Sequence, residues 1–185
     1  MYIDIVVLGL LMGLLMGGRI KNLGRLPLRG TGWFILLGVI EASMQFTQTP
    51  ERQFLYKSLI MFAGALMMLL LWANRHIPGV KLSLIGLFLN FLVMAANGGR
   101  MPVSQWAAVI SGQSDYLPEL LSDISARHVI IGSATKLVLL ADIIPLPPPY
   151  PFPRVLSIGD VILFAGIIRI IIKGMLERKS AATAD

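Results

Sequence analysis

The pattern of hydrophobic residues constrains this chain of 185 residues more than any other feature. Five apolar runs occupy residues 1–18, 33–46, 54–73, 82–96 and 155–173. Each approaches the ~20 residues that an α-helix needs to cross the ~30 Å hydrocarbon core of a bilayer. We therefore expect an all-α, polytopic membrane protein with five transmembrane helices, folded as one membrane domain over residues 1–185.

The overall composition supports this expectation and excludes several other classes. Hydrophobic residues make up 56% of the chain and charged residues 14%, whereas about a quarter of a typical soluble domain is charged. The absence of Cys excludes disulfides, thiol catalysis and Cys metal sites. Asp4, with no Lys or Arg before the first apolar run, argues against a cleaved signal peptide. We expect no cofactor and no metal.

The net charge of +6 is explained by membrane topology, and we expect no nucleic-acid partner. The basic residues gather in segments 19–30 and 74–81 and in the C-terminal tail, which five spans place on one side. Basic segments of this kind stay in the cytoplasm. The sequence therefore predicts a bacterial inner-membrane protein with its N-terminus outside and its C-terminus cytoplasmic.

An outer-face segment, residues 97–154, separates the fourth and fifth predicted spans. Asn97-Gly98-Gly99-Arg100-Met101-Pro102 is typical of a helix end, because Gly adopts the left-handed conformation and Pro cannot continue a helix. Ser104 is a candidate cap for a short amphipathic helix. A second helix is expected over 126–142, and residues 128–144 either lie against the outer face, re-enter the membrane or span it. Six prolines within 145–153 predict an extended strap.

Two polar residues inside predicted spans form a candidate intramembrane pair. Glu41 lies eight residues after Trp33, and Asn90 lies eight residues after Leu82 on a helix running the same way. The two side chains should therefore reach a similar depth. An ionisable residue within a membrane is a functional candidate. The pair is either a proton or cation site, or a hydrogen bond that holds two helices together.

The glycines of the first run and the polar start of the last run have structural interpretations. Gly9, Gly13 and Gly17 recur every fourth residue and predict a flat stripe for helix packing. Ser157-Ile158-Gly159-Asp160 matches an N-terminal capping box, with Asp160 in the first turn.

Three polar residues in the expected outer helix share a spacing of seven. His128, Thr135 and Asp142 would form one stripe along that helix. A His in this position serves either as a general base, a metal ligand or an interfacial residue.

Several of these motifs together resemble a known family. Asn97-Gly98-Gly99-x-Met101-Pro102, then His128, Asp142, Arg154 and Ser157-x-Gly159-Asp160, resemble a family of small bacterial integral membrane proteins described as a domain of unknown function. The resemblance implies a bacterial origin and a helical membrane fold, and it carries over no catalytic role. It suggests one outer-face polar site, formed by Asn97, Arg100, His128, Asp142, Arg154 and Asp160.

Three functions are consistent with the sequence. The first is a non-enzymatic binding or assembly subunit whose outer-face segment binds a partner subunit or a small ligand, or braces a larger assembly. The glycine stripe and the small size favour association with itself or with another membrane protein. The second is a membrane enzyme acting on a lipid or lipid-linked substrate, with His128 and an Asp as acid and base. The third is a small oligomeric transporter or channel centred on Glu41 and Asn90.

Overall fold

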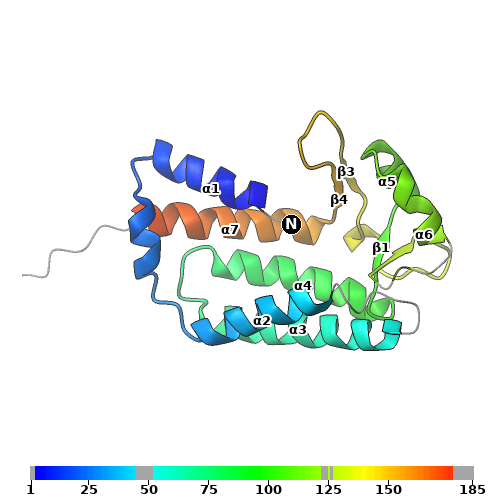
Figure 1. Cartoon of the computed structure of the whole chain (residues 1–185), viewed down its shortest axis with the longest axis horizontal. Coiled ribbons are helices and arrows are strands. Elements are labelled where there is room, and N and C mark those ends of the chain that lie inside the picture. Colours follow the sequence, from blue (N-terminus) through cyan, green and yellow to red (C-terminus); the bar gives the residue numbers. More distant parts are fainter. Residues whose placement is uncertain (1–2, 45–51, 122–124, 126, 177–185) are drawn as a thin grey trace, which may run out of the picture.

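Long helices lie along the long axis of the molecule and form its larger part (Figure 1). The computed structural model describes residues 3–44, 52–121, 125 and 127–176. Among these residues the long helices are α1 (Ile3–Leu15), α2 (Thr31–Met44), α3 (Gln53–Ala73), α4 (Val80–Ala96) and α7 (Ile158–Leu176). Each overlaps one of the five apolar runs, so the predicted positions of these helices are confirmed.

The expectation of five transmembrane helices is wrong. Within the described ranges only α3, with 21 residues and a mean hydropathy of 2.0, is long and apolar enough to cross a membrane. The helices α1, α2 and α4 have 13, 14 and 17 residues, fewer than the ~20 required. The 19 residues of α7 include Asp160, Arg169 and Lys173. The helices are shorter than some of the apolar runs because residues such as Gly17, with φ +80°, leave the helical conformation.

The tightest contact in the helical part joins α4 to α7, which lie side by side in Figure 1. A Cβ on Gly79 would lie 2.6 Å from the carbonyl oxygen of Gly166, and a Cβ on Gly86 would overlap the carbonyl oxygen of Gly159. Gly79 and Gly86 are seven residues apart in the sequence, and so are Gly159 and Gly166. Gly is therefore required at these positions, because any side chain would force the two backbones apart.

The glycine stripe of α1 faces α7. A Cβ on Gly9 would lie 3.0 Å from Cδ1 of Ile171, and one on Gly13 would overlap Sδ of Met175. Gly17 lies beyond the end of α1, with nothing within 4 Å of its ideal Cβ position. The stripe is thus covered within the chain, and Gly17 ends the helix rather than packing against another.

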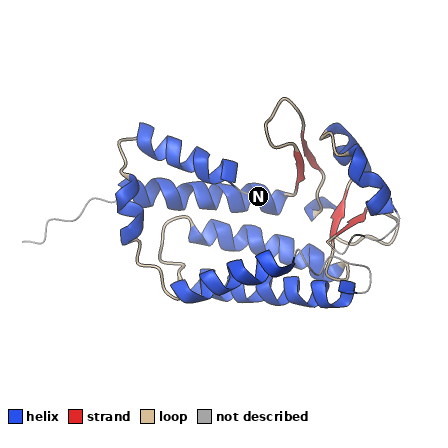
Figure 2. Ribbon diagram, in the orientation of Figure 1, coloured by secondary structure: helices blue, strands red, loops and turns tan. Residues whose placement is uncertain are grey.

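The remaining elements of residues 97–156, which we call the cap, form a separate part at one end of the long axis (Figures 1 and 2). The left-handed residues Gly98 and Gly99 follow α4, and Gly99 N donates to Met94 O at 2.8 Å, as expected for a helix end. Next come β1 (Met101–Val103), α5 (Gln105–Ile110), the 3₁₀ turn η4 (Ser114–Tyr116) and α6 (Leu117–Leu121). Ser104 Oγ accepts from Ala107 N at 3.3 Å, which confirms that Ser104 is the N-terminal capping residue of α5.

Two small sheets organise the cap, so a purely helical fold is also wrong. β1 pairs in parallel with β2 (His128–Ile130), and β3 (Ile144–Leu146) pairs antiparallel with β4 (Arg154–Leu156). An isolated parallel bridge joins Val103 to Asp142, beside β1. Figure 2 shows the strands gathered at the cap, away from the turns at the other end.

The helix expected over residues 126–142 is not formed, and its described part contains β2 and the 3₁₀ turn η5 (Val138–Leu140). The β-branched run Val129–Ile131 favours a strand, and Gly132 follows it. Thr135 Oγ accepts from Gly132 N at 2.9 Å and closes a turn. The expected stripe of His128, Thr135 and Asp142 therefore does not exist, and residues 128–144 form no re-entrant or spanning helix.

The proline-rich segment folds back on itself as the β3–β4 hairpin. Its extended ends pair in the register Ile144↔Leu156 and Leu146↔Arg154. The predicted extended conformation thus holds for residues 144–146, while most of the prolines form the loop between the strands. Ser111 Oγ donates to Arg154 O at 3.0 Å and connects α5 to this hairpin.

Candidate buried polar site between the cap and the helices

The first part of the site lies where α7 begins beside α4. Asn90 Nδ2 donates to Asp160 Oδ1, and Ser157 Oγ donates to Asn90 Oδ1, both at 2.8 Å. The capping box expected at the start of α7 is formed: Asp160 N donates to Ser157 Oγ at 2.9 Å, and Ser157 N donates to Asp160 Oδ2 at 3.0 Å. Asn90 is thereby joined to both members of the box.

Asp142 enters the same region from the cap. Its backbone is fixed beside β1, because its N–H donates to Pro102 O and its carbonyl accepts from Ser104 N, both at 2.9 Å. Asp142 is 8% exposed, and its Oδ1 has no hydrogen-bond partner among the described residues. Burial, reinforced by the charge of Asp160, raises the pKa of Asp142 well above its ordinary value, while Arg127 opposes this shift.

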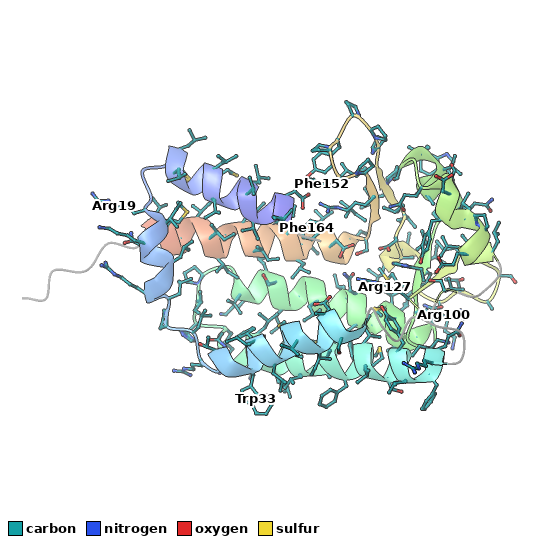
Figure 3. All side chains as sticks on the ribbon, viewed as in Figure 1. Arg19, Trp33, Arg100, Arg127, Phe152 and Phe164 are labelled. Atoms are coloured by element: carbon teal, nitrogen blue, oxygen red, sulfur yellow. The ribbon has the colours of Figure 1, made fainter. Side chains whose placement is uncertain are left out.

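Arg127 connects the cap to α3 and was not among the residues singled out from the sequence. Its guanidinium forms a side-chain hydrogen bond with Tyr56, which is buried in α3, and its charge also acts on Tyr116, His128 and Asp142. Figure 3 places Arg127 and Arg100 where the cap meets the helices. The only signal in the sequence is the position of Arg127 next to His128, before a β-branched run.

His128 is held by Tyr116 and Ser125. Its Nδ1 lies 3.4 Å from the Tyr116 hydroxyl, and the two rings meet edge to face with centroids 6.0 Å apart. Ser125 Oγ lies 2.8 Å from the same hydroxyl and accepts from His128 N at 3.3 Å. Burial, with a contribution from the charge of Arg127, lowers the pKa of His128 to about 3. The ring is therefore neutral at physiological pH, and no Asp is recorded within hydrogen-bond distance of it in the described structure.

Two other members of the expected outer-face site have different partners. Asn97 donates to Val93 O and Lys136 O and accepts from Lys136 N, so it fixes the segment after β2. Arg154 forms an ion pair with Asp4 of α1 and lies over the Phe164 ring, 5.6 Å from its centroid. Tyr150 OH donates to Asp4 at 2.6 Å, so the hairpin is attached to α1. Of the six expected residues, Asp142 and Asp160 lie close enough for the charge of Asp160 to act on Asp142, and the charge of Arg127 acts on both Asp142 and His128.

Glu41 and Asn90, the intramembrane pair expected from the sequence, each interact with other residues. Asn90 binds Asp160 and Ser157, and no contact with Glu41 is recorded in the described structure. Glu41 is exposed on α2, where its charge acts on Tyr56. No group of three His, Cys, Asp or Glu side chains suited to a metal ion occurs in the described ranges.

An apolar groove lies on the cap next to α5. It has a volume of about 630 Å³ and is lined by Ser104, Gln105, Trp106, Val109, Ile131, Val138 and Ile143. None of these residues is charged, and Trp106 is 63% exposed. The groove therefore offers apolar contact and two neutral polar side chains.

Comparison with known proteins identifies a family but no activity. The model of a family described as "Family of unknown function (DUF5317)" matches residues 25–172. A protein of Thermotoga maritima described as uncharacterized is 32% identical over 169 residues, which cover 90% of this chain and 88% of that protein. No solved structure matches. A family match of this extent and a relative of this similarity show that the chain belongs to the DUF5317 family of unknown function.

Proposed function

We propose that the chain is a bacterial inner-membrane protein that works by binding a partner through its cap rather than by catalysis. The observation that carries this proposal is the amount of large apolar surface left exposed, on the helices and again in the groove of the cap. Leu15 is 88% exposed and Phe54 is 85% exposed, and many other large apolar side chains of α1–α4 are also exposed. Soluble monomers rarely expose apolar patches of this kind, whereas lipid covers them in a membrane.

The membrane orientation follows from the charge at the two ends of the molecule. Arg29 is hydrogen-bonded to Asn74, and Asn22 is hydrogen-bonded to Met175 near the end of α7. Segments 19–30 and 74–81 and the last turn of α7, which carries Lys173, therefore lie together at the end opposite the cap (Figure 1). The positive-inside rule assigns this end to the cytoplasm and the cap to the outer side. The basic side chains gather at this end whatever the number of helices that span the bilayer.

Binding is favoured over catalysis by the state of the polar groups. The side chains of Asn90, Ser157 and Asp160 are hydrogen-bonded to one another, and His128 is held by Tyr116. An acid–base pair needs two groups that converge on a substrate. The groove, by contrast, is open and uncharged. We assign it to the apolar face of a helix from a partner membrane protein, with Trp106 as the main contact.

The membrane part is tested by washing cell membranes with alkaline carbonate. The protein should remain in the membrane pellet, and release into the supernatant would contradict the proposal. Cysteines introduced singly in this Cys-free chain, at Asp115 and at Lys21, test the orientation. An impermeant reagent added to intact cells stripped of their outer membrane should label position 115 and leave position 21 unlabelled.

The binding part is tested with a photo-crosslinker at Val138 in native membranes. The expected result is one protein adduct of defined mass, lost in Val109→Asp and retained in Leu121→Asp. Leu121 is the matched control because it is an exposed apolar residue of α6 outside the groove. Adducts with phospholipid alone, or an adduct that survives Val109→Asp, would show that no partner helix occupies the groove.

A further inference from the structure

At the end of the molecule opposite the cap, basic side chains from two distant segments line one hollow. Its volume is about 310 Å³, and its lining residues are Arg29, Ala73, Arg75, His76 and Lys81. Four of these five residues are basic and none is acidic. Figure 1 places the α3–α4 turn and the segment around η1 (Ile20–Arg25) at this end.

Hydrogen bonds build this hollow from residues 45 positions apart. Asn74, which is 1% exposed, accepts from Arg29 N at 2.7 Å and donates to Arg29 O at 2.9 Å. A third bond, from Asn74 to Leu70 O at 2.8 Å, holds the amide on the end of α3. His76 Nε2 donates to Pro27 O at 3.3 Å and makes a second connection between the two segments. The convergence of the basic residues is therefore a property of the fold.

The charge of the hollow is not balanced by the described parts of the chain. Arg154 forms an ion pair with Asp4, but no ion pair of Arg29, Arg75, His76 or Lys81 is recorded within the described residues. Gathering like charges around one hollow raises the free energy of the folded protein unless an anion is bound. The planar guanidinium of Arg is well suited to phosphate oxygens, and Lys contributes a further point charge.

The surroundings of the hollow indicate a lipid as the source of that phosphate. Arg75 lies over the ring of Trp72, 4.6 Å from its centroid, and donates to Trp72 O at 2.9 Å. Trp72 is 58% exposed on α3, next to the charged hollow. An exposed Trp beside basic residues is typical of the boundary between lipid head groups and acyl chains. A lipid phosphate would bind the basic groups while its acyl chains cover the apolar face of α3.

We propose that Arg29, Arg75, His76 and Lys81 form a binding site for the phosphate of an anionic phospholipid in the cytoplasmic leaflet. The proposal rests on the membrane location proposed above. Because no acid lines the hollow, it offers no partner for the ammonium group of a zwitterionic lipid. The site should therefore select lipids with net negative charge, as other basic pockets at cytoplasmic membrane surfaces do.

The test uses the full chain in neutral detergent and native mass spectrometry. Phosphatidylglycerol is expected to form a one-to-one adduct at a concentration at least tenfold lower than phosphatidylcholine with the same acyl chains. Arg29→Gln/Lys81→Gln should abolish this preference. Lys21→Gln/Arg25→Gln is the matched control: it removes two charges from the same end but outside the hollow, and it should retain the preference. Circular dichroism verifies that both variants keep the helical signal of the wild type.

Two further arms separate the alternatives. Glycerol phosphate and inorganic phosphate at the same concentrations should not displace the lipid, and displacement would show a site for free phosphate. Equal binding of both lipids, or equal loss in both double variants, would overturn the proposed site. If the protein stays in carbonate-washed membranes but shows no lipid preference, this inference fails and the proposed function stands. Release from the membranes overturns both.

Discussion

Asn90 and Asp160 are 70 positions apart in the sequence and joined by a hydrogen bond of 2.8 Å between α4 and α7. The same Asn90 side chain accepts from Ser157, the capping residue of α7. One amide therefore holds both groups that start the last helix. This contact fixes where α7 begins relative to α4 and brings Asp160 close enough to act on Asp142.

Replacing Asn90 should destabilise the fold. In Asn90→Ala the Ser157 hydroxyl loses its acceptor and the Asp160 carboxylate loses a donor. Such a loss at partly buried groups costs about 1–3 kcal/mol, so Tm should fall by several degrees in a thermal melt in detergent. Ser43→Ala is the control, because Ser43 is exposed and its hydroxyl donates to the carbonyl of Ile40, one turn away in α2. An unchanged Tm in Asn90→Ala would show that this contact contributes nothing to stability.

The glycines between α4 and α7 should tolerate no side chain. A Cβ on Gly159 would overlap Oδ1 of Asn90 and lie 2.8 Å from the carbonyl oxygen of Gly86. Overpacking of this kind costs about 1–3 kcal/mol, and we expect a lower Tm for Gly159→Ala. Gly38→Ala is the control, because nothing lies within 4 Å of that Cβ position in α2. It should leave Tm unchanged or raise it, since Ala is the better helix former. Equal effects of the two substitutions would rule out close packing as the cause.

Asp142 should make the protein less stable as the pH rises. The folded protein holds a proton on Asp142 that the unfolded chain releases above its ordinary pKa of 3.8, so folding is disfavoured at higher pH. Asp142→Asn should therefore have a higher Tm than the wild type at pH 8, with a smaller advantage at pH 4. The control Asp115→Asn, at an exposed position, should follow the wild type. A Tm difference for Asp142→Asn that is independent of pH would contradict the buried protonated acid.

His128 should have the opposite effect, in the acidic range. In the unfolded chain His128 gains a proton below pH 6.5, its ordinary pKa, whereas in the folded protein the pKa of His128 is lowered to about 3. Stability should therefore fall as the pH decreases between these values. His128→Gln should lose less stability than the wild type between pH 7 and pH 4, as measured by the Tm at each pH. Ser43→Ala, at an exposed position of α2 with a side chain that does not titrate, should behave like the wild type, and identical slopes for all three proteins would refute the prediction.

The positions of the helices were predictable because they depend on local sequence. Each apolar run contains enough helix-forming residues to specify α1, α2, α3, α4 or α7 without information from elsewhere in the chain. The helix-capping roles of Ser104 and Ser157 were predictable for the same reason, since a capping side chain accepts a hydrogen bond from a backbone N–H only a few residues away. The number of membrane spans was not predictable from these runs, because the helices that form within several of them are shorter or more charged than a span requires.

The segment from His128 to Ile144 shows where local sequence is insufficient. An apolar run with scattered polar residues suits either a helix or a strand. Here the backbone of Met101–Val103 supplies hydrogen-bonding groups, and it pairs with β2 and with Asp142. The strand partner, which lies more than twenty residues away, selects the strand.

The sequence by itself determined the positions of the five long helices and the capping residues Ser104 and Ser157, because each depends on neighbouring residues. The tertiary structure decided which polar groups meet. Asn90 is paired with Asp160 and not with Glu41, and Arg154 is paired with Asp4, because the close approach of glycines in α4 and α7 and the folding of the cap set those distances. Contacts between distant residues depend on how the elements pack, and local sequence does not encode that packing directly.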